Sequence, residues 1–144
     1  MKTDEHRAGL RGVIAFPVTP FNSDYSLDVP GLRKNLRFVL QHPISAVVAA
    51  GGTGEMYSLT PVEHREVVKA VVEEVGGRVP IIAGTGVNCQ LAIELARESA
   101  DLGADAILAL PPTIRIPMMV GSPNTTLPLV PPRPSRCLST VETG

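Results

Sequence analysis

The sequence is poor in aromatic side chains and contains no tryptophan; aromatic residues make up 3% of its 144 residues. So few rings leave little for a surface that stacks nucleic-acid bases. The formal net charge is −1, so no general attraction to nucleic acid or anionic membrane is expected. No run approaches the roughly 18 apolar residues of a membrane span, and no signal-type apolar core follows the N-terminus. The expected location is therefore the cytoplasm, without nucleic-acid or membrane partners.

Several chemical signatures are missing as well. No GxGxxG, GxxxxGK[ST] or GxSxG pattern occurs, which argues against nucleotide binding and serine hydrolysis. The two cysteines, Cys89 and Cys137, show no metal-binding spacing. The histidines His6, His42 and His64 are predicted to lie on a tail, a loop and a helix surface, without ligand-like neighbours. No metal site is expected.

What the chain does contain is a repeated unit of a short apolar strand followed by a helix. Strands are predicted to start at positions 13, 46, 81 and 106, and helices to follow a cap at Asp28, over Pro61–Val75 and over Gln90–Leu102. Wholly apolar strands that alternate with helices indicate a parallel sheet. Two α/β folds fit, a doubly wound open sheet and a (β/α)8 barrel, and periodicity does not choose between them.

The last part of the chain has a different composition. Residues 112–144 hold seven prolines in 33 residues, and no strand or helix period continues beyond Ile116. Such a composition buries too little apolar surface to order itself. We predict two regions, an α/β unit over residues 1–111 and a Pro-rich tail over 112–144 that is disordered or not native. The abrupt change after Pro112 also suggests a shifted reading frame.

The most informative segment is the glycine-rich loop Gly51–Glu55, which follows a predicted strand and precedes a helix capped by Thr60 and Glu63. Glycines let backbone N–H groups approach an anion closely, and α/β enzymes hold small carboxylates or phosphates in this way. We predict that the Thr53 hydroxyl and the loop amides hold a substrate carboxylate. The alternative is a simple turn in which Glu55 is a solvated or structural charge.

Other candidates follow the ends of the predicted strands, where parallel α/β folds bind their ligands. Gly84-Thr85-Gly86 is a weaker signal of the same kind. The hydroxyls of Thr19 and Ser58 are either partners near the site or local turn and cap groups. Tyr57, just after the glycine-rich loop, is a candidate for the wall of the site.

Lysine is scarce. The three lysines are Lys2, Lys34 and Lys69; the first lies near the N-terminus, and the other two lie on predicted polar helix faces. A lysine that forms a Schiff base needs a desolvated site that lowers its pKa. None of the three meets this requirement.

At this point residues 10–112 resemble the dihydrodipicolinate synthase / N-acetylneuraminate lyase superfamily of (β/α)8-barrel class I aldolases. The loop sequence Gly-Gly-Thr-Gly-Glu, followed by Met-Tyr-Ser-Leu-Thr-Pro, is most similar to the 5-dehydro-4-deoxyglucarate dehydratases of that superfamily. The stretches that carry the resemblance occur in the superfamily's order: Gly12–Phe21, Gly51–Glu55, Ser58–Pro61, Ile81–Gly86 and Leu110–Pro112.

The resemblance implies the N-terminal half of a TIM barrel with about four parallel strands, followed here by an irregular tail. It implies a Schiff-base lyase that dehydrates and decarboxylates a small 2-oxo sugar acid, without metal or cofactor. Gly52 and Thr53 occupy the family's carboxylate-binding pair.

Two departures from the family matter for activity. The family's proton-relaying tyrosine follows Leu-Pro-Pro, where this chain has Thr113, and its Schiff-base lysine lies on a later strand that this chain does not include. We therefore expect no catalytic residue in these 144 residues and no turnover by them. The alternative is a non-catalytic half-barrel module for binding or assembly, with a homo-oligomer as its possible form.

Overall fold

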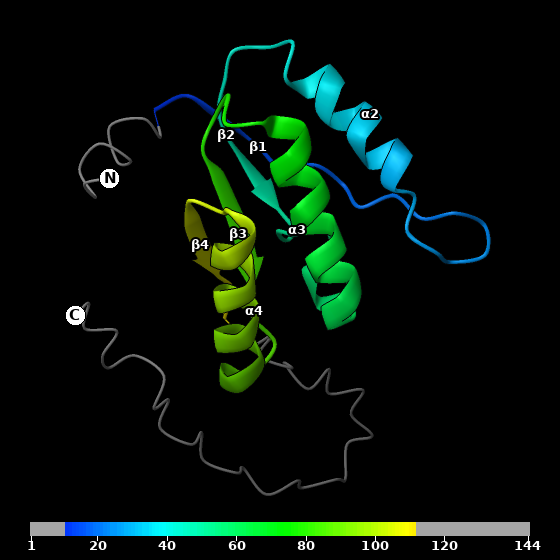
Figure 1. Ribbon diagram of the computed structural model, residues 1–144, viewed down its shortest axis with the longest axis vertical. Helices are drawn as coiled ribbons and strands as arrows, with labels where there is room; N and C mark the ends of the chain where they lie inside the picture. Colours follow the sequence, from blue (N-terminus) through cyan, green and yellow to red (C-terminus); the bar gives the residue numbers. More distant parts are fainter. Residues whose placement is uncertain (1–10, 112–144) are drawn as a thin grey trace, which may run out of the picture. The chain divides into compact units, whose positions relative to one another are not determined.

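The structure, a computed structural model, describes residues 11–111 (Figure 1). The predictions for the tail over 112–144, including Thr113 and the reading frame, lie outside the described residues. Within 11–111 strands and helices alternate along the chain in this order: β1 (Val13–Ala15), α2 (Val29–Val39), β2 (Ile44–Ala49), the 3-10 turn η1 (Met56–Ser58), α3 (Pro61–Val75), β3 (Ile81–Thr85), α4 (Cys89–Leu102) and β4 (Ala106–Ala109).

The four strands of this region form one parallel sheet in the order β1-β2-β3-β4, so each strand pairs with its neighbours in sequence. Helix α2 packs against α3, and α3 packs against α4, so the helices make one layer beside the sheet (Figure 1). A doubly wound sheet reverses its strand order and carries helices on both faces. Sequential strands with a single helix layer are the arrangement of a (β/α)8 barrel. The predicted α/β fold, a partial barrel, is confirmed.

Local capping signals decide where the helices begin and end. The carboxylate of Asp28 accepts a hydrogen bond from the Gly31 amide at the start of α2. Thr60 and Glu63 form a full capping box at the start of α3. Gly103 takes a left-handed φ of 104° at the end of α4, a conformation that costs glycine little. None of the helices in the described part is long and apolar enough to cross a membrane.

The core lies between the helix layer and the sheet. Helix α3 contributes more of its buried residues than any other element, since its valine stripe faces the strands. β-branched residues are mediocre helix formers, so packing rather than propensity holds this helix, as the sequence indicated. The sheet supplies alternate residues of its two central strands to the same cluster. The buried members from α3 and the sheet include Val67, Val68, Val71, Val75, Val47, Ala49, Ile81 and Ala83.

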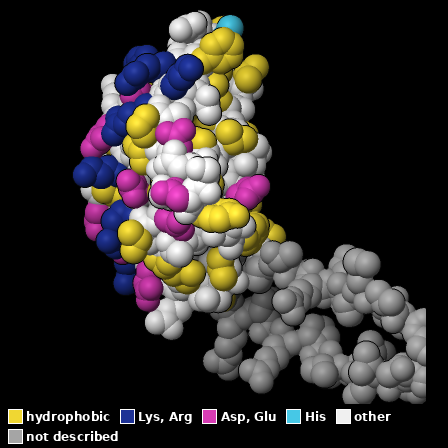
Figure 2. Space-filling view, turned by 90° about the vertical axis from the view of Figure 1, so that its right-hand side faces the viewer, with side chains coloured by type: hydrophobic (Ala, Val, Ile, Leu, Met, Phe, Trp, Pro, Cys, Tyr) yellow, Lys and Arg dark blue, Asp and Glu magenta, His cyan; other side chains and the backbone are white. Residues whose placement is uncertain are grey.

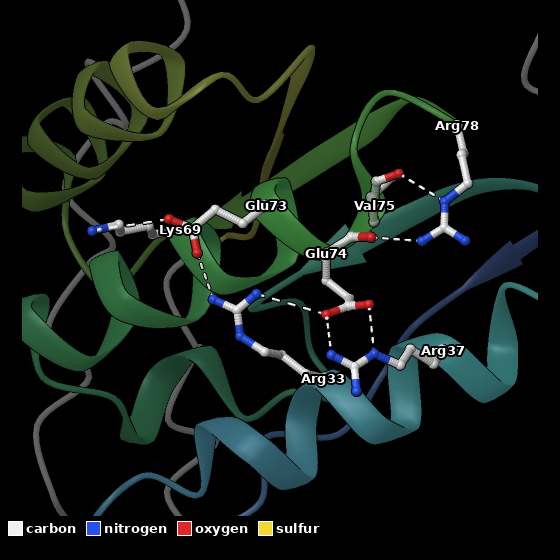
Figure 3. Close-up of polar contacts among 7 residues, drawn as sticks. All are labelled: Arg33, Arg37, Lys69, Glu73, Glu74, Val75 and Arg78. Atoms are coloured by element: carbon white, nitrogen blue, oxygen red, sulfur yellow. Dashed lines mark hydrogen bonds and ion pairs between the residues drawn. The ribbon is translucent and has the colours of Figure 1, made fainter.

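Ion pairs join α2 to α3 on the outer side of the helix layer (Figure 3). Arg37 makes two hydrogen bonds to the Glu74 carboxylate, of 2.9 and 3.1 Å, which hold the pKa of Glu74 below its ordinary value. Arg33 bridges Glu73 and Glu74. Acidic and basic side chains intermingle along one side of the surface in Figure 2. Exposed pairs of this kind contribute little to stability, because solvent and salt screen the charges.

Candidate functional site

The loop Gly51–Glu55 leaves the C-terminal end of β2, where the other strands of the parallel sheet also end. It is a compact turn, because the Glu55 amide donates to the Gly52 carbonyl at 3.1 Å and the Met56 amide to the Gly51 carbonyl at 3.2 Å. Ala50 and Glu55, on either side of the loop, both have left-handed backbone, with φ of 47° and 54°. Non-glycine residues adopt this conformation with some strain, which the surrounding packing must hold.

The tip of the loop is its open part. Gly52 and Thr53 are exposed, whereas Gly51 and Gly54 on either side are buried. Within residues 11–111, the Thr53 hydroxyl and the amides of Gly52, Thr53 and Gly54 take part in no hydrogen bond. Successive unused N–H groups and a hydroxyl are the donors that a small anion needs. The geometry of the tip therefore suits the role predicted for Gly52 and Thr53.

Two hydrogen bonds join the loop and the residues just after it to the segments that follow β1 and β4. The Thr19 hydroxyl, in the segment after β1, donates to the Gly54 carbonyl at 2.8 Å. The Tyr57 hydroxyl donates to the carbonyl of Pro111, just beyond β4, at 3.0 Å. The Leu110 amide in turn donates to the Thr85 carbonyl at 2.7 Å, so the β4 end is itself held to β3. Thr19 thus contacts the loop itself and Tyr57 contacts the segment after β4, whereas their roles at a binding site stay predictions.

The Gly84-Thr85-Gly86 segment has a packing role. A Cβ atom on Gly84 would overlap the Ala50 carbonyl oxygen, because the backbone entering the glycine-rich loop lies directly against β3. A Cβ on Gly86 would come within 2.7 Å of the Met56 side chain. The Thr85 side chain is buried, at 1% exposure, so its hydroxyl is not offered to a ligand. This segment makes room for the loop, and the sequence could not distinguish that role from direct binding.

His64 does not lie on a helix surface, and that prediction was wrong. It is 2% exposed in the first turn of α3, with Nε2 2.7 Å from the Gly84 carbonyl oxygen. Because a carbonyl only accepts, Nε2 carries the proton and donates. Burial lowers the pKa of His64 and keeps the ring neutral. Its position three and four residues before Val67 and Val68 continues the apolar stripe, which is the signal that could have revealed its burial.

The remaining candidates lie at the surface. Ser58 is exposed, and its hydroxyl makes no hydrogen bond within residues 11–111. Lys34 is exposed on α2; Lys69 is exposed on α3, with Nζ 4.0 Å from Glu73. Both amines are solvated as predicted, and neither belongs to the loops at the C-terminal ends of the strands. Lys2 lies outside the described residues.

Charge at the site is sparse. The loop carries one charged side chain, the exposed Glu55, and no lysine or arginine. Within residues 11–111, no group of three or more acidic, histidine or cysteine side chains could hold a metal ion. An anion at the tip would therefore be bound by neutral donors.

A separate pocket opens on the outer face between α2 and α3 and has a volume of about 180 Å³. None of its lining residues belongs to the loops that follow the C-terminal ends of the strands. They are Val29, Arg33, Glu66, Lys69, Ala70 and Glu73.

The sequence matches the dihydrodipicolinate synthetase family over residues 9–119. A probable 5-dehydro-4-deoxyglucarate dehydratase of Bradyrhizobium diazoefficiens is 48% identical over 101 residues, which are 70% of this chain and 32% of that protein. The chain thus spans about a third of the length of the curated relatives that it matches.

Solved structures agree with this match. The dihydrodipicolinate synthase of Bacillus clausii superposes with a TM-score of 0.69 at 34% identity, over 72% of this chain and 36% of that one. The chloride-inhibited dihydrodipicolinate synthase of Acinetobacter baumannii, complexed with pyruvate, superposes with a TM-score of 0.68 at 36% identity and the same coverage. Both are similar to the partial barrel described above.

Proposed function

The chain belongs to the dihydrodipicolinate synthetase family, and we propose that it carries the carboxylate-binding loop of a lyase barrel that acts on a 2-oxo acid. In this proposal Gly52 and Thr53 bind the substrate carboxylate. The observation that carries it is the exposed loop tip, whose Thr53 hydroxyl and amides are unused within the described residues. A relative of this family is crystallised with pyruvate, a small 2-oxo acid.

The reaction that we propose for the whole barrel is dehydration and decarboxylation of 5-dehydro-4-deoxyglucarate. The names of the curated relatives support it, together with the Gly-Gly-Thr-Gly-Glu loop. The loop would hold the carboxylate next to the reacting carbonyl by directional hydrogen bonds, so that the carbonyl faces the amine that attacks it. The amine converts the carbonyl to a protonated imine, an electron sink.

These 144 residues would supply the binding loop without that amine. Lys34 and Lys69 are exposed on the helix layer, whereas a lysine that forms a Schiff base needs a desolvated site. We therefore propose that this chain binds a 2-oxo acid weakly and forms no imine with it.

Titration of the 15N-labelled chain with pyruvate tests the binding role. The amide signals of Gly52 and Thr53 should shift on titration. Thr53→Val should weaken binding about three- to tenfold, the loss of one net hydrogen bond, whereas Thr53→Ser should retain it. Ser58→Ala, which removes a nearby exposed hydroxyl, is the matched control. If the loop amides do not respond to pyruvate, the carboxylate role of Gly52 and Thr53 is wrong.

The same samples test the chemical role when borohydride is added and the intact mass is measured. The chain should gain no reduced pyruvate, whereas the Bradyrhizobium diazoefficiens relative serves as the full-length comparison. A stable adduct on this chain would contradict the proposal, and peptide mapping would then tell a lysine from the N-terminal amine as its site.

A second candidate function is a half-barrel module that assembles with a second copy. It is favoured by the two outer strands, because β1 and β4 each have one strand neighbour within residues 11–111. Unpaired strand edges favour association. Sedimentation velocity should then give a discrete dimer that melts cooperatively, and a cooperatively folded monomer would rule this candidate out.

A further inference from the structure

We propose that Thr19 and Tyr57 are positioning residues, which hold the Gly52–Thr53 tip in its anion-binding geometry through hydrogen bonds from two different strand ends. This inference rests on the proposed function for its consequence, a higher affinity for a 2-oxo carboxylate. The positioning itself concerns the free protein and can be measured without any ligand.

The hydrogen bond of Tyr57 connects the residues after the loop to the segment that follows β4. η1 begins directly after the loop and places the Tyr57 side chain so that its hydroxyl donates to the Pro111 carbonyl at 3.0 Å, across 54 residues of sequence. The side chain is 43% exposed, so burial alone does not explain where it lies. The other tyrosine, Tyr25, is 86% exposed and its hydroxyl makes no hydrogen bond within residues 11–111. The contact of Tyr57 is therefore specific.

The hydrogen bond of Thr19 comes from the other side of β2, from the segment after β1. Its hydroxyl donates at 2.8 Å to the carbonyl of Gly54, the residue that directly follows the tip. Gly54 is buried and packs closely here, since a Cβ atom on it would lie 3.3 Å from both the Pro17 carbonyl oxygen and the Thr19 hydroxyl. The peptide between Gly54 and Glu55, directly after the tip, therefore has a fixed partner.

The start of the loop is held by the third contact, the close approach of Ala50 to Gly84 on β3. The two-residue tip thus lies between anchored points, while its own donors find no partner among residues 11–111. A flexible loop that becomes ordered when a ligand binds loses conformational entropy, and this loss lowers the affinity. A loop that is ordered before the ligand arrives avoids that loss, which is how preorganisation raises affinity.

The test uses the near-isosteric variants Tyr57→Phe and Thr19→Val in the 144-residue chain. Each should lower the 15N order parameters of Gly52 and Thr53 in the free protein. Each should also weaken pyruvate binding about three- to tenfold, the value of one net hydrogen bond. Thr19→Ser keeps the hydroxyl and should restore both properties. Tyr25→Phe, which removes an exposed hydroxyl from a distant turn, should change neither.

The outcomes separate this inference from the proposed function. If the tip loosens in the variants and pyruvate binds to none of the proteins, the positioning role stands and the carboxylate role of the loop fails. If order parameters and pyruvate affinity both match those of the unmodified chain, the positioning role is wrong. A variant that loses thermal stability while Gly52 and Thr53 stay ordered shows a purely structural role and also overturns it.

Discussion

Replacing Gly84 with alanine is expected to lower the free energy of unfolding by about 3 kcal/mol. The new Cβ would overlap the Ala50 carbonyl oxygen and lie 2.9 Å from its carbonyl carbon and 3.1 Å from the Gly51 Cα. All three neighbours are backbone atoms, so no side chain can rotate away to make room. The strand would have to separate from the loop, and the His64 contact to Gly84 would be disturbed with it.

Gly52→Ala is the matched control, because it makes the same chemical change in the adjacent loop. A Cβ on Gly52 would meet nothing within 4 Å, and Gly52 is not among the positive-φ glycines of the described residues. Its stability should stay within about 0.5 kcal/mol of the unmodified chain. Urea denaturation of the three proteins gives both values. Equal midpoints for Gly84→Ala and Gly52→Ala would show that the β2–β3 contact is looser than described.

His64→Leu is expected to lower the free energy of unfolding by about 2 kcal/mol at pH 7.5. The leucine fills much of the ring volume but leaves the Gly84 carbonyl without its histidine donor, and an unsatisfied buried acceptor costs about 1–3 kcal/mol. His64→Gln retains an amide donor of similar reach and should cost less. Urea denaturation at pH 7.5 checks both variants, and a His64→Leu protein as stable as the unmodified chain would contradict the role of this hydrogen bond.

The same residue predicts a pH dependence. The pKa of His64 lies below its ordinary value of 6.5 because burial disfavours the charged ring. Above pH 6.5 the ring is neutral in both the folded and the unfolded chain, so its contribution is fully present. As the pH falls below 6.5, the unfolded chain binds a proton that the folded chain does not, and stability drops at up to about 1.4 kcal/mol per pH unit.

The unmodified chain should therefore lose stability between pH 6.5 and 5 more steeply than His64→Gln, which has no titrating group there. Free energies of unfolding at several pH values measure the difference. Parallel curves for the two proteins would mean that His64 is not held neutral in the fold.

Sequence features close together along the chain could be interpreted before the structure was known. Thr60, Glu63 and Gly76 mark the ends of α3 through capping chemistry, which acts within a few residues. The apolar runs located all four strands to within a few residues of where they lie. The motif Gly51–Glu55 predicted an anion-binding loop, because glycines after a strand let backbone amides approach an anion; this role stays a prediction.

Features that depend on partners far along the chain could not be predicted. The hydroxyl of Thr19 contacts a residue 35 positions away, and that of Tyr57 a residue 54 positions away. Neither partner is a side chain, so no pair of residue types indicated the contact. For His64 the sequence predicts a helix surface, whereas its hydrogen-bond partner is a backbone carbonyl on β3, 20 residues away.

The sequence by itself determined the alternation of strands and helices, the helix boundaries and the family, because these depend on local propensity, capping and short motifs. Only the tertiary structure decided that the strands lie in sequential order under one helix layer, since both parallel folds share one periodicity. It also decided that Gly84 makes room for a neighbouring backbone while Gly52 stays open. Both are glycines after a strand, and only the atoms packed around each one distinguish a structural contact from a binding site.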